Sequence, residues 1–202
     1  LKEDSTYDYG QTILSGRLYF SNYYKYAFRD IYSRWAQIID LNYSFAPFDR
    51  KIYGTEISLK TAFYFPGFFP SNGIRIRVEK EKQEPEKYML TSRVSLPRGY
   101  KNIISSDINF LSVDYVMPLA YPDFNLGSIL YLKRIRTSLF YDYAEGTGNT
   151  YYENSSNGLT PLYRHNYKET FKSFGFELVT DFHIFRTPYM ISSGVQTAWK
   201  TI

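Results

Sequence analysis

The chain has 202 residues, no cysteine, a formal charge of +4, and 22 Tyr and 16 Phe among its aromatic residues. The lack of cysteine excludes disulfides and thiolate metal sites, and the small charge is well below that of a nucleic-acid-binding protein. No apolar run approaches the about 18 residues of a transmembrane helix. So many rings at a mean hydropathy of −0.39 are typical of a membrane β-barrel, which uses aromatic side chains on its outer face and interfacial girdles.

Alternation of apolar and polar residues predicts four strands in the first part of the chain, over residues 11–24, 35–45, 56–65 and 73–79. In the third of these, Ile57, Leu59, Thr61, Phe63 and Phe65 alternate with Glu56, Ser58, Lys60, Ala62 and Tyr64. Residues 23–34, between the first two strands, fit either a loop or a short helix. Residues 66–73 form a turn rich in rings.

The middle of the chain is predicted to contain a charged connection and then more strands. Residues 79–87 have the composition of a solvated link. They are followed by a fifth strand at 88–96 and a loop that carries Arg98. Residues 107–120 and 130–144 are predicted as the sixth and seventh strands.

The last part of the chain is predicted to hold one long loop and two strands. Residues 145–170 are rich in Gly, Asn, Ser and Tyr, which is ordinary for an external loop of a membrane barrel. Residues 171–184 and 189–199 are the eighth and ninth predicted strands.

Charged and polar residues recur on one face of successive predicted strands, with apolar and aromatic residues on the other. This arrangement predicts an all-β, antiparallel transmembrane β-barrel with a wet interior and a lipid-facing exterior. The residues expected to line its lumen are Glu56, Lys60, Arg75, Arg77, Arg134, Arg136, Asp181 and His183. A soluble sandwich would have to bury these charges at a large energetic cost.

The nine predicted strands suggest that the chain, residues 1–202, is one barrel domain and a fragment of a longer polypeptide. Bacterial outer-membrane barrels have an even number of strands and long external loops. With residues 145–170 outside, the Arg98 loop, the Phe68–Phe69 turn and residues 23–34 all fall on the external side. The ninth strand then ends at the cell surface, so we expect at least one further strand, in a barrel of ten or more.

The loop at Leu96-Pro97-Arg98-Gly99-Tyr100 places an arginine between a proline and a glycine, on a bent backbone where it needs a partner. It resembles the arginine-glycine-aromatic motif in the lumen-inserted loop of the surface-antigen barrel superfamily, which includes outer-membrane assembly factors and two-partner secretion transporters. Three later segments resemble the strands that follow in that family: Val113–Leu119 (VDYVMPL), Leu139–Asp142 (LFYD) and Ser173–Leu178 (SFGFEL). The resemblance covers roughly residues 88–199, and the general style is similar to the C-terminal barrels of large envelope proteins of the Bacteroidota.

The resemblance implies that Arg98, with Gly99 and Tyr100, folds into the lumen and binds Asp142, with Asp114 or Glu177 as secondary partners. Such a pair would lock the loop. The implied function is that of an outer-membrane subunit of an envelope complex, in protein or lipid assembly or in translocation. Its implied partners are outer-membrane lipid and other envelope proteins.

Two other functions stay open, namely a passive pore or structural barrel that anchors a periplasmic domain or accessory proteins, and a soluble all-β binding domain. We expect neither an enzyme nor a metal or cofactor site. The two histidines, His165 and His183, lie in the predicted long loop and near a strand end, without the serine that a hydrolase would require.

Overall fold

The computed structural model describes residues 12–24, 30–48, 54–84, 90–101, 105–154, 158–185 and 187–201. Within these residues the protein is all-β, as the alternation predicts. The strands are β1 (Leu14–Tyr23), β2 (Ala36–Phe45), β3 (Thr55–Pro66), β4 (Gly73–Glu84), β5 (Asp107–Ala120), β6 (Phe124–Leu126), β7 (Leu130–Asn154), β8 (Gly158–Ile184) and β9 (Ile191–Thr201).

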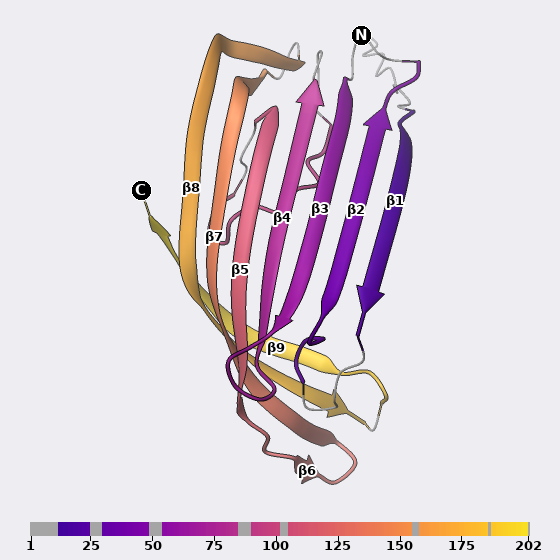
Figure 1. The fold of residues 1–202 in the computed structure, drawn as a ribbon, viewed down its shortest axis with the longest axis vertical. Coiled ribbons are helices and arrows are strands. Elements are labelled where there is room, and N and C mark those ends of the chain that lie inside the picture. The colour runs from indigo at the N-terminus through magenta and orange to yellow at the C-terminus, as the bar shows by residue number, and fades with distance from the viewer. Residues whose placement is uncertain are drawn as a thin grey trace, which may run out of the picture.

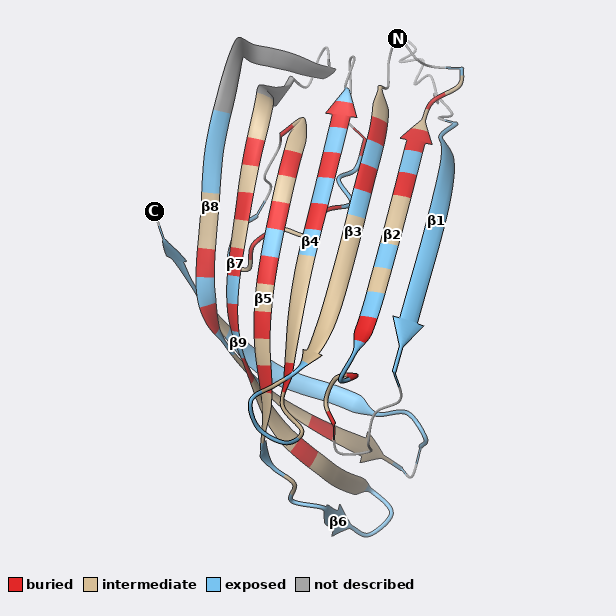
Figure 2. Cartoon of the chain, viewed as in Figure 1, coloured by how far each residue is buried: buried red, intermediate tan, exposed pale blue. Residues whose placement is uncertain are grey.

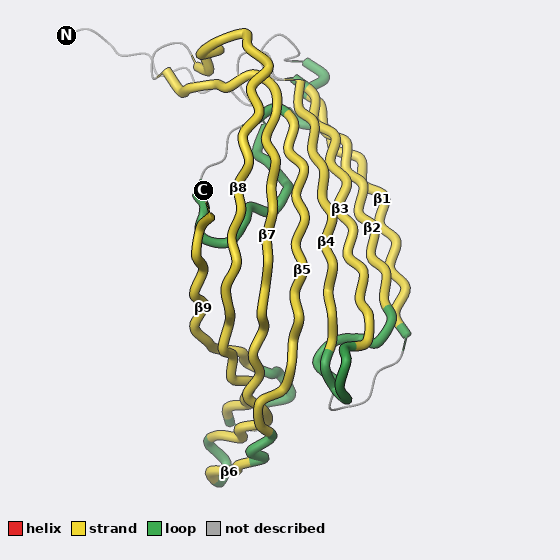
Figure 3. The backbone as a smooth tube through the Cα atoms, turned by 60° about the vertical axis from the view of Figure 1, so that its left-hand side comes forward, coloured by secondary structure: helices red, strands yellow, loops and turns green. Residues whose placement is uncertain are grey.

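The strands form one antiparallel sheet in the order β1-β2-β3-β4-β5-β7-β8-β9, with the short β6 paired to β7. The sheet is strongly curved (Figures 1 and 3). It is not closed into a barrel among the described residues, because β1 and β9 are its two edges. The antiparallel all-β prediction is therefore confirmed, and closure into a ring stays a prediction.

No helix among the described residues has the length and apolarity needed to cross a membrane.

The two faces of the sheet have the reverse of the usual burial pattern. Polar side chains such as Ser58, Asp114 and Asp142 are fully buried, whereas their apolar neighbours Ile57 and Leu139 are exposed. Figure 2 shows this as alternating bands along β3, β5 and β7. We call the polar side, which residues 90–101 cover, the concave face, and the apolar side the convex face (Figure 3).

The fifth strand predicted at 88–96 is wrong over its described part, residues 90–96. Strand β4 pairs directly with β5 from Gly73↔Val116 to Lys82↔Asp107, which leaves no place in the sheet for another strand between them. Residues 90–101 instead run as irregular chain over the concave face (Figure 3). The count of nine strands is reached through β6, which the alternation did not reveal.

The solvated connection predicted at 79–87 is also wrong over its described part, because β4 continues to Glu84. Within it, Glu79, Glu81 and Gln83 are buried on the concave face.

The long loop predicted at 145–170 is wrong as well. Strands β7 and β8 continue to pair as far as Asn154↔Gly158, with register shifts near Gly148 and Thr150. The Gly, Asn and Ser content suggested a loop, but the interspersed Tyr and Thr residues favour strand.

These corrections change which connections lie together. Strands β2, β4 and β7 end at the upper end of the sheet in Figure 1, whereas β1, β3 and β8 end at its lower end. The Phe68–Phe69 turn and residues 30–35 therefore lie at the lower end of the sheet, whereas the segment that carries Arg98 follows the upper end of β4. The prediction that all three share one side is wrong, because it counted a strand that does not exist.

Candidate functional site

The candidate site is the segment of residues 90–101 together with the concave face beneath it. Carboxylates and an amide of β4 bind its backbone. Glu81 Oε2 accepts hydrogen bonds from the amides of Arg93 (2.6 Å) and Val94 (3.2 Å), and Gln83 Nε2 donates to the carbonyl of Leu90. Buried backbone groups need hydrogen-bond partners. For these two amides and one carbonyl the partners are side chains and not the backbone of a neighbouring strand.

Glu79 extends this row of contacts toward Arg98. Its carboxylate accepts hydrogen bonds from the amide of Ser95 (2.7 Å) and from the Ser95 hydroxyl (3.0 Å). The three inward side chains of β4, spaced two residues apart as strand geometry requires, thus hold residues 90–95 along their length.

Arg98 lies at the centre of the site, where its guanidinium contacts three carboxylates from three strands. Nε and Nη2 donate to the two oxygens of Asp142 on β7 at 2.8 and 2.9 Å, and the Arg98 amide donates to the same carboxylate at 2.9 Å. Nη2 also lies 2.6 Å from Asp114 on β5, and Nη1 lies 2.9 Å from Glu177 on β8. The guanidinium lies 3.6 Å from the centre of the Phe140 ring, a close cation–π contact.

A tight turn presents Arg98 in this position. The amide of Tyr100 donates to the carbonyl of Pro97 at 3.1 Å, and Gly99 has a φ of 91°. That φ lies in the region that only glycine adopts without strain. The Tyr100 ring then packs edge-on against Phe171 at 5.3 Å, and Lys200 Nζ of β9 lies 4.9 Å from its centre.

The charge of Arg98 is fixed by its surroundings. Burial lowers the pKa of Arg98, but the hydrogen bond to Asp142 and the charge of Asp114 outweigh burial, so the pKa is raised above the ordinary value of an arginine. The raised pKa contributes stability that is fully present below the unfolded-state pKa, and this contribution is lost only as the pH rises through the higher folded-state value. A pH change in the physiological range therefore cannot release the segment by deprotonating Arg98.

A small apolar cluster supports the segment beside the charges. Val94 packs with Ile108 and Phe110 of β5 and Ala144 of β7, with Phe171 against them. This cluster is local, because the buried residues around it on the concave face, such as Ser112, Asp114 and Asp142, are mostly polar.

A second cluster of charges lies lower on the concave face, on β7 and β8. Asp181 is fully buried. It accepts hydrogen bonds from Arg134, from Arg136 at 3.2 Å and from the hydroxyl of Ser192 at 2.6 Å. His183, two residues beyond Asp181, stacks on the ring of Tyr131, and the side chain of His165 lies outside the described residues.

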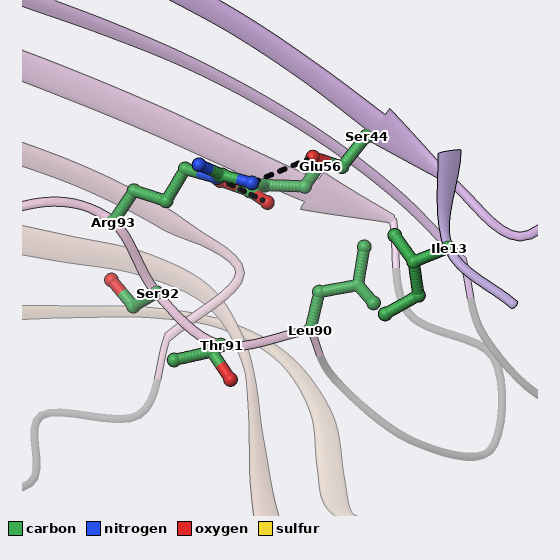
Figure 4. Close-up of a pocket in the computed structure, with 7 residues that line it drawn as sticks. All are labelled: Ile13, Ser44, Glu56, Leu90, Thr91, Ser92 and Arg93. Carbon is green, nitrogen blue, oxygen red and sulfur yellow. Dashed lines mark hydrogen bonds and ion pairs between the residues drawn. The ribbon is translucent and has the colours of Figure 1, made fainter. Parts of the chain in front are cut away.

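A cavity of about 320 Å³ opens at the upper end, between residues 90–93 and the sheet. In Figure 4 the Arg93 guanidinium crosses it to Glu56 and Ser44. Nε lies 3.2 Å from Glu56 Oε1, and Nη2 donates to Ser44 Oγ at 3.2 Å. Ile13 and Leu90 form its apolar wall. Because Arg93 already occupies the carboxylate, the cavity is part of the attachment of the segment.

The convex face carries a belt of apolar side chains that crosses the sheet obliquely. On β3 the belt covers residues 57–65, and on β8 it covers residues 174–184. The strand pairings across β4, β5 and β7 place Ile57, the first belt residue of β3, level with Lys168 of β8. They place Phe65, the last belt residue of β3, level with Phe176 of β8. The upper boundary is thus displaced by six residues and the lower by eight over four strand steps. Above the belt, this face carries Lys80, Lys82, Asn109, Glu145 and Lys168.

The structure brings together the six residues expected around the inserted loop: Arg98, Gly99, Tyr100, Asp114, Asp142 and Glu177. Those expected on the polar face also lie on the concave face, but in separate groups. Glu56 pairs with Arg93, Arg75 with Asp114, and Arg134 and Arg136 with Asp181. Lys60 faces Asp40 and Glu79 in the ladder, and Arg77 donates to Ser112.

Sequence reasoning missed the residues that hold the backbone of the segment, namely Glu79, Glu81 and Gln83, and also Phe140 beneath Arg98. The signal that could have found the first three is their spacing of two, in register with the inward Arg75 and Arg77 of the same strand.

No protein-family model, curated protein or solved structure matches this chain. Among the described residues, no group of three or more acidic or histidine side chains could hold a metal ion.

Proposed function

We propose that the chain forms part of an outer-membrane β-barrel with the concave face as its lumen, and that it acts as a subunit of an envelope complex in protein or lipid assembly or translocation. The oblique apolar belt of the convex face is the observation that carries the membrane assignment. An apolar surface of this extent on a soluble protein would have to be covered by a partner.

The slope of the belt matches strands tilted in a bilayer. A displacement of six to eight residues over four strand steps, at about 3.3 Å per residue and about 4.8 Å per strand, gives a tilt of about 50°. Transmembrane strands tilt by about 45°. The 9 to 11 residues of the belt then span about 20 Å across the membrane, near the about 25 Å band of known barrels.

The filled concave face supports an assembly or translocation role over a passive pore. Residues 90–101 cover the face, and Arg98 attaches them to β5, β7 and β8. A permanently open channel would not need an occluding segment held by buried charges. The resemblance of Leu96–Tyr100 to the inserted loop of the surface-antigen barrels supports the same assignment.

The membrane assignment is tested with tryptophan as a depth probe. Leu139→Trp lies midway along the belt on β7, and it is made with Trp35→Phe and Trp199→Phe, which remove both native tryptophans. In proteoliposomes, we expect lipids brominated near the ends of their acyl chains to quench the tryptophan introduced at position 139 strongly. Lys80→Trp, on the same face above the belt, is the matched control and should be quenched only by shallow bromines. Equal and weak quenching of both would refute the assignment.

The functional assignment needs a separate assay. We expect proteoliposomes that contain the protein to accelerate membrane insertion of a small unfolded β-barrel protein relative to empty liposomes. If insertion is not accelerated while the ion conductance is high, the protein is a pore, and the membrane assignment is unaffected.

A further inference from the structure

A second segment lies on the concave face, at the lower end of the sheet. Between β1 and β2, Asp30 and Ser33 are buried. The Ser33 hydroxyl donates to the carbonyls of Tyr24 (2.6 Å) and Trp35 (2.9 Å), and Arg134 donates to the carbonyl of Asp30 at 3.4 Å. We call residues 30–33 the lower segment and residues 90–101 the upper segment.

Tyr32 is the residue of the lower segment that lies against β3 and β4. Its ring meets Tyr64 edge-on at 5.3 Å. It also lies directly over Gly73, where an added Cβ would be 3.2 Å from the Tyr32 side chain. A side chain at position 73 would therefore require Tyr32 to shift by a few tenths of an ångström.

One carboxylate connects the two segments. Asp114 Oδ1 accepts a hydrogen bond from Arg98 of the upper segment at 2.6 Å, and Asp114 Oδ2 accepts one from Arg75 at 3.1 Å. The guanidinium of Arg75 lies in turn 5.4 Å from the centre of the Tyr32 ring. The contacts from Arg98 through Asp114 and Arg75 to Tyr32 thus run without a break from one end of the face toward the other.

The Asp114 side chain is 1% exposed, so its carboxylate forms both ion pairs where water does not reach it. Removal of Arg98 from this position would admit water to Asp114 and Arg75. Charge–charge and cation–π attraction both weaken when the partners are solvated. Arg75 would then hold Tyr32 less firmly, although no contact of the lower segment itself had been changed.

We infer that the upper and lower segments are coupled through Asp114 and Arg75, so that release of either one from the concave face loosens the other. The direction of this coupling rests on the proposed function. In the membrane orientation of that function, the two segments enter the lumen from opposite sides of the bilayer. The contacts then carry a conformational signal across the membrane, from the Arg98 loop to the opposite side.

The coupling is tested by cysteine accessibility, because the sequence contains no cysteine. Ser33→Cys reports on the lower segment and Val94→Cys on the upper one, since both positions are buried. We expect Arg98→Ala to raise the rate of maleimide labelling of Ser33→Cys by about tenfold, in the range of ordinary coupling between sites. Because coupling is reciprocal, Tyr32→Ala should raise labelling of Val94→Cys, and this second measurement stands if Arg98→Ala does not fold.

Two further variants separate coupling from general loosening. Arg17→Ala removes an ion pair on the same face that has no contact with Asp114, and it should leave labelling of the lower segment unchanged. In an Arg75→Gln background, Arg98→Ala should no longer change the labelling rate there. If Arg98→Ala exposes the thiol of the upper segment but not that of the lower one, the two segments are independent and the inference fails. Labelling is measured in detergent as well as in liposomes, so this outcome is distinct from failure of the membrane assignment.

Discussion

Arg98 and Arg17 bind carboxylates on the same concave face with nearly the same geometry but at very different depth. Arg98 places two nitrogens 2.8 and 2.9 Å from the oxygens of Asp142, and Arg17 places two nitrogens 2.8 Å from those of Asp40. The Arg98 side chain is 14% exposed, and that of Arg17 is 59% exposed. Equal distances therefore do not imply equal strength, because the medium around the pair sets both its attraction and the penalty for breaking it.

The largest effect is expected from Arg98→Ala. It leaves Asp142 and Asp114 buried with one cation fewer, and breaking a buried pair in this way costs about 3–5 kcal/mol. We expect residues 90–101 to leave the concave face, with a matching loss in the free energy of unfolding by urea in lipid vesicles. Protease sensitivity near Ser95 should rise in parallel.

Arg98→Lys is the matched control for Arg98→Ala. It keeps the charge but not the fork that reaches three carboxylates, so it should lie between wild type and Arg98→Ala. An Arg98→Ala protein as stable as wild type, with residues 90–101 still protected, would show that the contacts beneath the segment hold it without the arginine.

Glu81→Ala should have the next largest effect, because it removes the acceptor of the Arg93 and Val94 amides. Two buried amides without partners should cost about 2 kcal/mol or more. Glu81→Gln keeps one oxygen and should recover part of the loss. The check is amide hydrogen exchange at residues 93 and 94, which should speed up in Glu81→Ala while exchange in β8 stays slow. Unchanged exchange at these two amides would contradict the role given to Glu81.

The strands that the sequence predicts best are those whose two faces meet the most different surroundings. Within the belt, every second residue of β3 and β8 is apolar or threonine and none of these residues is buried, so period-two alternation is explicit in the sequence. The opposite holds for residues 88–96, where alternation is present in the sequence but the described backbone bonds to side chains. Its amides donate to Glu79 and Glu81, and the carbonyl of Leu90 accepts from Gln83. Local periodicity cannot tell a strand whose amides pair with a neighbouring strand from a segment whose amides pair with side chains.

The contact between Arg98 and Asp142, expected from the resemblance, is present in the structure. Spacing alone could not have predicted it, because the two residues lie 44 positions apart. Phe140 lies under Arg98 only because it shares the concave face with Asp142, two residues on. That fact follows from the register of β7 and not from the sequence of the loop.

Arg93→Ala tests an ion pair of intermediate exposure, since the Arg93 side chain is 38% exposed and that of Glu56 is 2% exposed. Its loss leaves one buried carboxylate without its cation, but at a site that water can reach through the cavity. We expect roughly 1–2 kcal/mol, between the values for exposed and buried pairs. Glu56→Gln with Arg93→Ala should restore part of that stability by removing the unpaired charge. A double variant no more stable than Arg93→Ala would show that the charge of Glu56 is already well solvated.

The smallest effect is expected from Arg17→Ala. The guanidinium lies on the edge strand β1 and is mostly in water, so the ordering of its side chain offsets most of what its two hydrogen bonds contribute. We expect no measurable change in the urea midpoint at physiological salt. The loss of stability caused by Arg98→Ala, measured in parallel, should change little as the salt concentration is raised, because buried charges are poorly screened. A large loss of stability in Arg17→Ala would mean that this edge of the sheet is covered in the folded protein, since only a partner that excludes water could give an exposed pair the strength of a buried one.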